Sequence, residues 1–370
     1  MRVLHLVSCR GWSSDAYWAA RVSHELAQRG HEVTLGCRAG TEARVIERAR
    51  REGVDDIVTF ALQSGLRAAA DAADLRRLSA WLARVDLVHV HRGKEHWLAA
   101  LANRLSATPR PLVRTRHIVQ AVRPHAANRW LYRRATRLTI TVSEAIRRQY
   151  IAAGLVATER VVALPGGVAA ERYAPRPADA ELRRRFGAAD GELLVGLVGG
   201  LRPMKGHRVV VEAAARLAAE RLPVHFVFVG RGNQEGPLRE MLQRAGLGAR
   251  ITLTGFLDDL PAAMATLDVG LYVSFESEGM SRVVWEYLAA GCPLIASRVG
   301  VVPEALVDGD HALLVPAGDA AALARALRRL AGDGDLRRRL GEAGRRLVAA
   351  RYSGGRVAAA LEEHYRRLAP

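Results

Sequence analysis

The stretch 274–300, SFESEGMSRVVWEYLAAGCPLIASRVG, contains two glutamates eight positions apart, Glu278 and Glu286. The first stands in a loop beside Gly279, and the second lies one turn into an apolar helical pattern, between Trp285 and Tyr287. A carboxylate among apolar side chains needs hydrogen-bond donors, and sugar hydroxyls would serve. The backbone amides after the glycine can hold an anion. The stretch therefore predicts a site for a ligand that carries both hydroxyls and negative charge.

A second motif, GLVGGLRPMKGH at 196–207, ends a strand pattern in glycines and places Arg202 and Lys205 before a helix. Glycines let a ligand approach the backbone, and two cations near a helix start suit a diphosphate. The spacing of a Walker loop, GxxxxGK[ST], is absent. Taken alone, the motif fits a glycine turn with solvated cations equally well.

The elements that must position these residues alternate between short apolar runs and helical patterns, which indicates βαβ units around parallel sheets. In the first half we expect strands over 2–8, 31–37, 56–60, 86–91, 111–117, 137–143 and 160–165, with helices over 15–29, 42–52, 69–84 and 96–105. In the second half we expect strands over 193–200, 224–230, 250–255, 268–274 and 293–297, with helices over 206–220, 235–245 and 282–290 and Arg-rich helices from 319 onward.

The 370 residues exceed the length that one hydrophobic core usually serves, so two domains are expected. We place an N-terminal Rossmann-like domain at 1–170, a linker at 171–190, a second Rossmann-like domain at 191–350, and a C-terminal helix at 351–370 that returns to the first domain. The expected fold class is α/β, with two doubly wound parallel-sheet domains facing a cleft. Ligands of such sheets bind beyond the carboxyl ends of the strands, here in the loops after Ser8, His91, His117, Gly199, Gly230 and Ser274.

The charge distribution is uneven, because the formal net charge is +17 and most of the excess lies in the first half. Residues 1–175 hold 28 basic and 15 acidic residues, whereas 176–370 hold 27 and 23. A basic half suits nucleic acid, an anionic membrane face or a phosphorylated substrate. The alternative is an Arg-rich composition with a solvated surface, since the cations are dispersed. Only two of the 55 basic residues are lysines, Lys94 and Lys205.

Composition narrows the class of protein further. No apolar run approaches the length of about 18 residues that a membrane span needs. The start, MRVLHLVSCRGW, is typical of a first strand and not of a signal peptide, which favours a cytoplasmic location. Three scattered cysteines, Cys9, Cys37 and Cys292, exclude a disulfide framework and a CxxC metal knuckle, so we expect small buried side chains.

The order of the second-half segments, from GLVGGLRPMKG through FVFVGRGNQEGPLREML to EGMSRVVWEYLAAGCPLIASRVG, resembles the family 4 retaining glycosyltransferases of the GT-B fold. The likeness spans nearly all of 193–330. The first half is similar more loosely, through MRVLHLVS, LAQRGHEVTL, VHVH and VSEAIRR. In that family the second domain binds a nucleotide sugar through a Glu-x7-Glu motif, whose spacing Glu278 and Glu286 match.

The resemblance implies roles for individual residues. Glu286 would hold the ribose hydroxyls of the donor, and Glu278 would face the transferred sugar. The backbone amides of Gly279, Met280 and Ser281 would hold the diphosphate together with Lys205. Arg231, Phe256 and Leu257 would flank the base. His117 would sit at the sugar and acceptor hydroxyls, so the implied catalytic residues are His117, Glu278 and Lys205.

Two departures from the family pattern matter. Gly200 stands where the family has an arginine, so Arg202 must take that role or no residue does. The usual glycine pair near the amino terminus is replaced by GWSSD, in which Gly11 alone fits. Its other residues are expected to shape the acceptor pocket: Trp12, Ser13, Ser14 and Asp15.

The segment HVHRGKEHWLAAL at 89–101 crowds three histidines after a strand. His89 and His91 point to one face of the strand, but a pair of histidines with no third defined ligand predicts a metal site only weakly. Such histidines are more often core or cleft residues. We expect the loop 92–96 to contact the acceptor through Arg92, Lys94 and His96.

A nucleophile elbow, a Ser/His/Asp order and an Asp-x-Asp metal pair are not evident in the sequence. This absence is consistent with the function that the resemblance implies. That expected function is metal-independent, retaining transfer of a hexosyl or related sugar from a nucleotide sugar to a hydroxyl acceptor, a lipid-linked or cell-surface glycan of the lipopolysaccharide type. No cofactor and no nucleic-acid partner are expected. The basic first half favours peripheral association with the anionic inner membrane face. A catalytically inactive polyanion or nucleic-acid binder and a GT-B nucleotide-sugar epimerase are the alternatives, and the sequence leaves UDP, GDP and ADP open.

Overall fold

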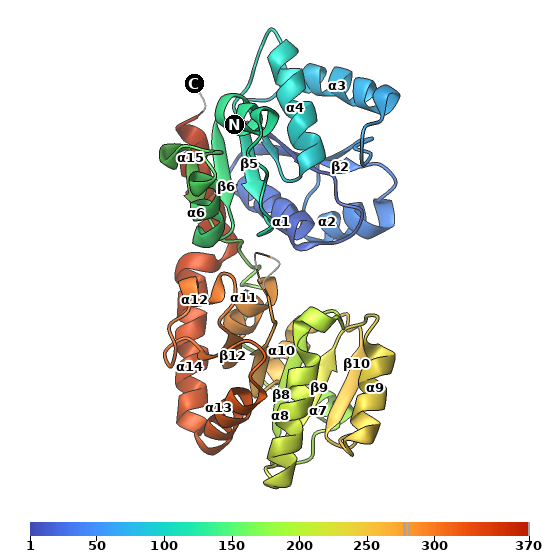
Figure 1. Cartoon of the computed structure of the whole chain (residues 1–370), viewed down its shortest axis with the longest axis vertical. Coiled ribbons are helices and arrows are strands. Elements are labelled where there is room, and N and C mark those ends of the chain that lie inside the picture. Colours follow the sequence, from blue (N-terminus) through green and yellow to red (C-terminus); the bar gives the residue numbers. More distant parts are fainter. Residues whose placement is uncertain (277–278, 280, 369–370) are drawn as a thin grey trace. The chain divides into compact units, whose positions relative to one another are not determined.

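The computed structural model describes residues 1–276, 279 and 281–368. They form two compact units, each built around its own parallel sheet. The first unit contains residues 1–167, Gly279 and the C-terminal segment from Gly354, and the second contains the residues between, from Val168 to Ser353. The predicted fold class of two parallel-sheet α/β domains is thus confirmed (Figure 1).

The first unit has a seven-stranded parallel sheet with the strand order β3-β2-β1-β4-β5-β6-β7. Its strands are β1 (Arg2–Val7), β2 (Glu32–Arg38), β3 (Ile57–Phe60), β4 (Leu87–Val90), β5 (Leu112–Arg116), β6 (Leu138–Thr141) and β7 (Val161–Ala163). Its helices are α1 (Ser14–Gln28), η1 (Glu42–Ile46), α2 (Glu47–Arg51), α3 (Ala68–Leu82), α4 (Gly93–Leu105), α5 (Ala126–Trp130), η2 (Leu131–Ala135), α6 (Glu144–Ala152), η3 (Thr158–Arg160) and α15 (Gly354–Arg366).

Alternating residues of β1 face opposite helical layers of this unit. Leu4 and Leu6 are buried in a cluster with residues of α3, α4 and α6. Val3 is buried in another cluster, with Trp18 of α1 and Leu361 of α15. The strands are therefore covered on both faces, which explains their near-continuous apolar runs.

The second unit has a six-stranded parallel sheet with the strand order β10-β9-β8-β11-β12-β13. Its strands are β8 (Leu193–Val198), β9 (Val224–Val229), β10 (Ile251–Gly255), β11 (Val269–Tyr272), β12 (Leu294–Ser297) and β13 (Leu313–Val315). Its helices are α7 (Ala180–Arg185), η4 (Pro203–Lys205), α8 (His207–Ala219), α9 (Glu235–Arg244), α10 (Leu260–Thr266), α11 (Arg282–Ala289), α12 (Val302–Ala305), α13 (Ala320–Gly332), α14 (Gly334–Leu347) and η5 (Val348–Tyr352).

Side-chain caps fix where several helices begin. The Ser143 hydroxyl accepts a hydrogen bond from the Ile146 amide at the start of α6. Asp319 and Asp333 accept the corresponding amides of α13 and α14, at 2.8 and 2.7 Å. These residues satisfy amides that a helix start leaves without an intrahelical partner.

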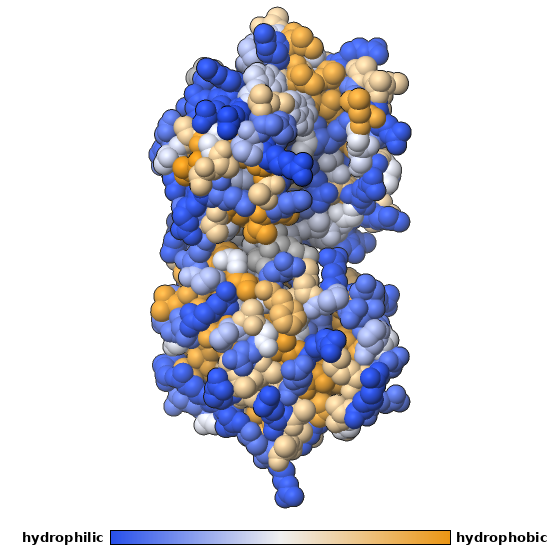
Figure 2. Space-filling view, in the orientation of Figure 1, coloured by the Kyte–Doolittle hydropathy of each residue, from blue (hydrophilic) through white to orange (hydrophobic). Residues whose placement is uncertain are grey.

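The molecular surface mixes residue types. On the face shown in Figure 2, hydrophilic and hydrophobic residues alternate over each unit. Among the described residues, no helix combines the length and the apolar character that crossing a bilayer requires. The three cysteines are free and buried, as predicted.

Candidate functional site

Four histidines of the first unit form a buried row on the side of the sheet that α1 covers. His5 lies on β1 and His89 on β4, where the strand register pairs them directly. His91 follows β4 and His117 follows β5, and all four are at most 5% exposed. The indole of Trp18 packs against the rings of the last three, with centroid distances of 5.3 to 5.7 Å.

Hydrogen bonds join three of these rings in a line. Nδ1 of His5 lies 3.1 Å from Nε2 of His91, and Nδ1 of His91 lies 3.1 Å from Nε2 of His117. The line ends at Nδ1 of His117, a buried atom without a hydrogen-bond partner. That free nitrogen is the natural contact point for a ligand.

The other end of the row is closed by the C-terminal helix. The Tyr365 hydroxyl on α15 is hydrogen-bonded to Nδ1 of His89 and lies 3.3 Å from Nε2 of His5. Nε2 of His89 in turn lies 2.6 Å from the Thr115 hydroxyl. Both ring nitrogens of His5, His89 and His91 thus have polar partners.

From the sequence, His89 and His91 have no third defined ligand for a metal. In the structure, His5 lies beside them. The ligand atoms of His5, His89 and His91 lie within 4.8 Å of one another. A divalent cation there would break the hydrogen bonds of the row and would add charge beside the buried Arg114 guanidinium, which already disfavours protonation of His89 and His91. This cluster therefore fits a hydrogen-bonded row of neutral rings better than a metal centre.

A cavity of about 250 Å³ opens at the free end of the row. Its lining is Asp15, His91, Arg92, Gly93, Arg114, Arg116, His117 and Ile118. Arg114 is 2% exposed, and its Nε and Nη1 atoms have no hydrogen-bond partner. Three arginines thus converge on one small cavity, which favours an anionic ligand group.

Burial and charge set the protonation states at this cavity. Burial lowers the pKa of His117 to about 3, so the ring is neutral at pH 7. Burial acts to raise the pKa of the Asp15 carboxyl, but the His117 imidazole when protonated and the Arg92 guanidinium together bring it below its ordinary value. Asp15 is therefore an anion that already has a cationic partner, since Arg92 Nε donates to it.

Of the predicted acceptor segment 11–15, Asp15 alone is among the cavity-lining residues. Ser13 caps α1 and hydrogen-bonds to Asp15, which holds that carboxylate in place. Trp12 packs its ring edge against Tyr17, with centroids 6.3 Å apart. Gly11 is half-buried and Ser14 is exposed, and neither lines the cavity.

The prediction of a loop over 92–96 is wrong, because α4 begins at Gly93. The Glu95 carboxylate accepts the Arg92 amide at 2.7 Å and so stabilises this early start. Lys94 points to an ion pair with Asp71 at 2.6 Å. His96 is buried and its Nε2 lies 2.8 Å from the Thr136 hydroxyl. Of the three predicted contacts, Arg92 lines the cavity, and Lys94 and His96 do not.

Gly279 packs with the first unit, directly against His117. A methyl group on its Cα would lie 1.8 Å from the His117 carbonyl oxygen, and its φ is +131°, so this position admits glycine alone. Glu278 and Met280, which flank it, lie outside the described residues. The backbone after the first predicted glutamate thus reaches the same strand end as His117.

In the second unit, glycines let the loops after β8 and β9 come together. A side chain on Gly230 would lie 2.0 Å from the Gly199 carbonyl, and one on Gly232 would lie 2.2 Å from the Leu201 carbonyl. Gly206, with φ +76°, would clash with the Val273 carbonyl at 2.0 Å. These close approaches place the motif 196–207 at the carboxyl ends of β8, β9 and β11.

A second cavity, of about 460 Å³, lies on this edge, lined by Arg202, Pro203, Met204, Arg231, Gly232 and Asn233. Both arginines are exposed, and Lys205 ends the adjacent single-turn helix η4. A side chain on Gly200 would lie 3.6 Å from Nε of Arg202. The Arg202 guanidinium therefore occupies the space beside the position where the family has its arginine.

The predicted base-flanking residues follow β10. Phe256 is 57% exposed, and Leu257 is half-buried against the core of the second unit. Gly255 lies close to the Arg231 side chain, since a methyl group on its Cα would lie 3.6 Å from Nε of Arg231. The Arg231 side chain and the exposed Phe256 thus both lie at the carboxyl end of β10.

Glu286 lies on α11 and is 2% exposed. Its Oε1 accepts a hydrogen bond from the Tyr173 hydroxyl at 3.0 Å and pairs with Nε of Arg282 at 3.0 Å. A buried carboxylate needs such donors, as the sequence indicated. Tyr173 was not predicted, because nothing in the sequence sets position 173 beside the helix. Arg282 could have been found, since it stands four residues before Glu286 in the expected helix, the spacing of a helical ion pair.

The neighbours of Glu286 have structural roles. Trp285 stacks on Tyr352 at 4.1 Å, and the Tyr287 hydroxyl binds the β8 backbone, accepting from the Val198 amide and donating to the Gly196 carbonyl at 2.9 Å each. Ser281, at the start of α11, has φ +51° and its hydroxyl lies 2.7 Å from that of Tyr272. A non-glycine residue in this region is uncommon and marks local strain.

Comparison with known proteins assigns the class. Glycosyltransferase Family 4 matches residues 16–172, and Glycosyl transferases group 1 matches residues 178–347. The chain is 33% identical to 2-deoxystreptamine N-acetyl-D-glucosaminyltransferase of Streptomyces fradiae, over 94% of this chain and 89% of the relative. Anabaena Alr3699/HepE in complex with UDP superposes with a TM-score of 0.86 at 20% identity, over the whole of both chains. A glycosyltransferase of Rickettsia africae gives 0.87 at 18%, over 99% and 98%.

The fold is therefore that of the GT-B glycosyltransferases. The chain belongs to glycosyltransferase family 4, as its sequence motifs predicted.

Proposed function

We propose that this chain transfers a sugar from a nucleotide-sugar donor to an acceptor hydroxyl, with retention of configuration and without a metal ion. The second unit binds the donor and the first unit binds the acceptor. The observation that carries this proposal is the buried Glu286 carboxylate, which Tyr173 and Arg282 hold in one orientation. A carboxylate held in this way accepts hydrogen bonds from vicinal ribose hydroxyls.

Cations on the same strand edge would bind the diphosphate. Arg202 and Arg231 line one cavity, and Lys205 follows within the same motif. Negative charge develops on the leaving diphosphate in the transition state. Fixed cations therefore stabilise the transition state more than the bound donor, which lowers the barrier. Arg202 binds the diphosphate in place of the arginine that the family has where this chain has Gly200. Glu278 toward the sugar and the amides of 279–281 toward the phosphates remain predictions from the sequence.

At the acceptor, His117 is the proposed contact for the reacting hydroxyl. Its Nδ1 is buried without a partner in the cavity that Arg92, Arg114 and Arg116 also line. The S. fradiae relative is named for 2-deoxystreptamine, an amine. Asp15 pairs with Arg92, but Arg114 and Arg116 also line the cavity and disfavour a cationic acceptor by like-charge repulsion. We therefore propose an acceptor with a phosphate or carboxylate, such as a lipid-linked or cell-surface glycan intermediate.

A thermal-shift panel with UDP, GDP and ADP sugars tests the donor site. A ligand that binds only the folded state stabilises it by about 2.7 kcal/mol at 100 times its Kd. We expect one nucleotide class to raise the melting temperature of the wild type and of Glu240→Gln, a surface control, and not of Glu286→Gln. An undiminished shift in Glu286→Gln would place the nucleotide elsewhere.

The reaction itself is tested with the donor that the panel selects. Proton NMR of the product reports the anomeric configuration, and a chelator tests metal independence. Retention and full activity in the presence of chelator are expected. Inversion, or loss of activity that an added divalent ion restores, would overturn the corresponding part of the proposal.

A further inference from the structure

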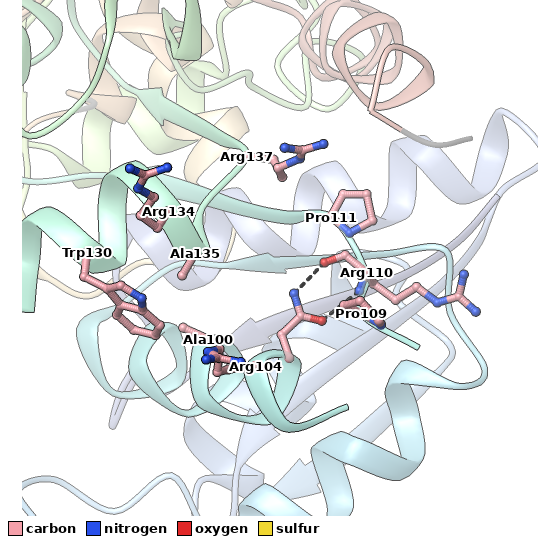
Figure 3. A pocket seen from close by; sticks show the side chains of 10 residues that line it. Ala100, Arg104, Pro109, Arg110, Pro111, Trp130, Arg134, Ala135 and Arg137 are labelled. Atoms are coloured by element: carbon pink, nitrogen blue, oxygen red, sulfur yellow. Dashed lines mark hydrogen bonds between the residues drawn. The ribbon is translucent and has the colours of Figure 1, made fainter. Parts of the chain in front are cut away.

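A pocket of about 530 Å³ lies on the edge of the first sheet opposite to His117, and Figure 3 shows the residues that line it. Arg110 and Pro111 lead into β5, and Arg137 leads into β6. Because the strands are parallel, both amino ends lie at one edge, whereas His117 follows the carboxyl end of β5. This pocket is therefore separate from the proposed acceptor site.

The pocket is strongly basic. Four arginines line it, Arg104, Arg110, Arg134 and Arg137, and its described lining contains no carboxylate. The chain has no acidic residue between Glu95 and Glu144, while that segment holds nine arginines. The basic excess of the first half is thus concentrated in the segment that builds this pocket.

The pocket wall is preformed. The Asn103 side chain donates to the Arg110 carbonyl and accepts from its amide, at 2.7 Å each. Nε of Arg110 donates to the Leu82 carbonyl at 2.9 Å. This part of the wall is therefore already ordered before binding, which lowers the entropy cost of binding there.

Exposed apolar side chains border the arginines. The indoles of Trp130 and Trp97 stack with centroids 6.0 Å apart and planes 19° apart. Leu101 and Leu105 follow Trp97 at intervals of four on α4 and so share its face. They are 40% and 78% exposed, respectively. Two large apolar side chains beside a cluster of cations favour a partner that is both anionic and apolar.

We propose that this surface binds the anionic face of a phospholipid membrane. We call it the Arg–Trp surface and define it by Leu101, Arg104, Leu105, Trp130, Arg134 and Arg137. The arginines hold lipid phosphates, the indole lies at the headgroup level, and the leucines enter the acyl boundary. A nucleic acid would also use the arginines and the indole, but it gives the exposed leucines no partner. The charge and the apolar groups together therefore favour the membrane.

This inference gives a location to the membrane association that the basic first half of the sequence favours, and it does not depend on the transfer reaction. The two are separable in experiment because the Arg–Trp surface and the donor site share no residue. Donor binding, measured by thermal shift, reports on the proposed function alone. Vesicle binding reports on the Arg–Trp surface alone.

The test is co-sedimentation of the full chain with phosphatidylcholine vesicles, with and without phosphatidylglycerol. We expect binding to the anionic vesicles only, weakened at least tenfold in Arg134→Glu/Arg137→Glu and reduced in Leu105→Ser. The matched control is Arg50→Glu/Arg51→Glu, which makes the same charge change at exposed arginines of α2 in the same unit. This control is expected to bind within twofold of the wild type.

Four outcomes would overturn the inference. The first is that the wild type does not bind anionic vesicles, and the second is that the two double variants lose binding equally. The third is that millimolar inorganic phosphate releases the bound chain at constant ionic strength. The fourth is that Arg134→Glu/Arg137→Glu weakens binding to a single-stranded RNA while its binding to vesicles persists. Unchanged far-UV circular dichroism and an unchanged melting temperature without donor in both double variants show that the losses do not arise from misfolding of the first unit, which carries these arginines.

Discussion

Nδ1 of His91 lies 3.1 Å from Nε2 of His117, and Nε2 of His91 lies 3.1 Å from Nδ1 of His5. A neutral imidazole carries one N–H and one bare nitrogen, so each bond joins an N–H of one ring to the bare nitrogen of the next. Both bonds form only when the three rings carry their proton on the same nitrogen. The bonds with His91 and His5 thus decide whether Nδ1 of His117 carries a proton where it meets the cavity.

We expect His5, His91 and His117 to carry the proton on Nε2. In that arrangement the bare Nδ1 of His117 faces the cavity that Arg92 and Arg114 line, and guanidinium groups only donate. The opposite arrangement would turn an N–H toward these cations. Long-range ¹H–¹⁵N correlation spectra at pH 7.5 report the tautomer of each ring, and different tautomers among the three would contradict the row.

Replacing Tyr365 by phenylalanine removes the hydroxyl that joins His5 and His89 and preserves the shape of the ring. We expect a loss of about 1–3 kcal/mol in unfolding free energy, because buried ring nitrogens lose their partner. The imidazole signals of His5 and His89 should shift as well. Urea unfolding and the same NMR spectra measure both effects.

Tyr132→Phe is the matched control for that variant. Its hydroxyl is also buried in the first unit, but its partner, the Tyr150 hydroxyl, lies at the limiting distance of 3.5 Å. We expect this change to cost less and to leave the histidine signals in place. Equal losses in the two variants would show that the Tyr365 hydroxyl has no special role.

Stability should fall as the solution becomes mildly acidic. Burial lowers the pKa of His5 and His117 to about 3 and that of His207 to about 4, below the value of about 6.5 expected in the unfolded chain. Below pH 6.5 the unfolded chain therefore binds more protons than the native one. Each such histidine lowers the unfolding free energy by up to about 1.4 kcal/mol for each pH unit below 6.5. This loss of stability is absent above pH 7.

Urea titrations at pH 7.5, 6.5 and 5.5 measure this slope before most carboxylates begin to titrate. We expect the unfolding free energy to decrease from pH 6.5 to 5.5, with a slope that corresponds to an uptake of more than one proton on unfolding. A free energy independent of pH over this interval would mean that the buried histidines protonate without unfolding.

Gly206→Ala should destabilise the second unit by about 1–3 kcal/mol, because the residue has φ +76° and its new side chain would meet the Val273 carbonyl at 2.0 Å. The strain would also displace Lys205 and weaken donor binding. Gly248→Ala, which meets nothing within 4 Å, is the control. Melting temperatures with and without donor measure both effects, and equal behaviour of the two variants would show that the tight turn does not matter.

The sequence predicts the sheets of this protein well because buried parallel strands are unbroken apolar runs. The expected strands 193–200 and 224–230 correspond to Leu193–Val198 and Val224–Val229. The start of α4 was missed, since glycine is a poor helix former and Gly93 begins this helix. That error placed Lys94 and His96 in a loop.

The histidine row could not be predicted, because it depends on long-range register. His5 meets His89 only through the pairing of β1 with β4, and Tyr365 arrives from a helix 276 residues away from His89. A signal was nevertheless present, since His5, His89 and His91 all lie within or beside apolar runs expected to be buried. Polar residues in such runs require partners, which the sequence does not identify.

The dependence of His5 on Tyr365 has a consequence for biosynthesis. The first strand emerges from the ribosome hundreds of residues before the helix that covers it, whereas the second unit is nearly continuous in sequence. During translation the second unit can finish folding while the first still exposes the apolar surface around Trp18 that Leu361 later covers. The first unit is thus the last to complete its folding. A nascent chain stalled before residue 354 would leave this apolar surface exposed, and chaperones bind such surfaces.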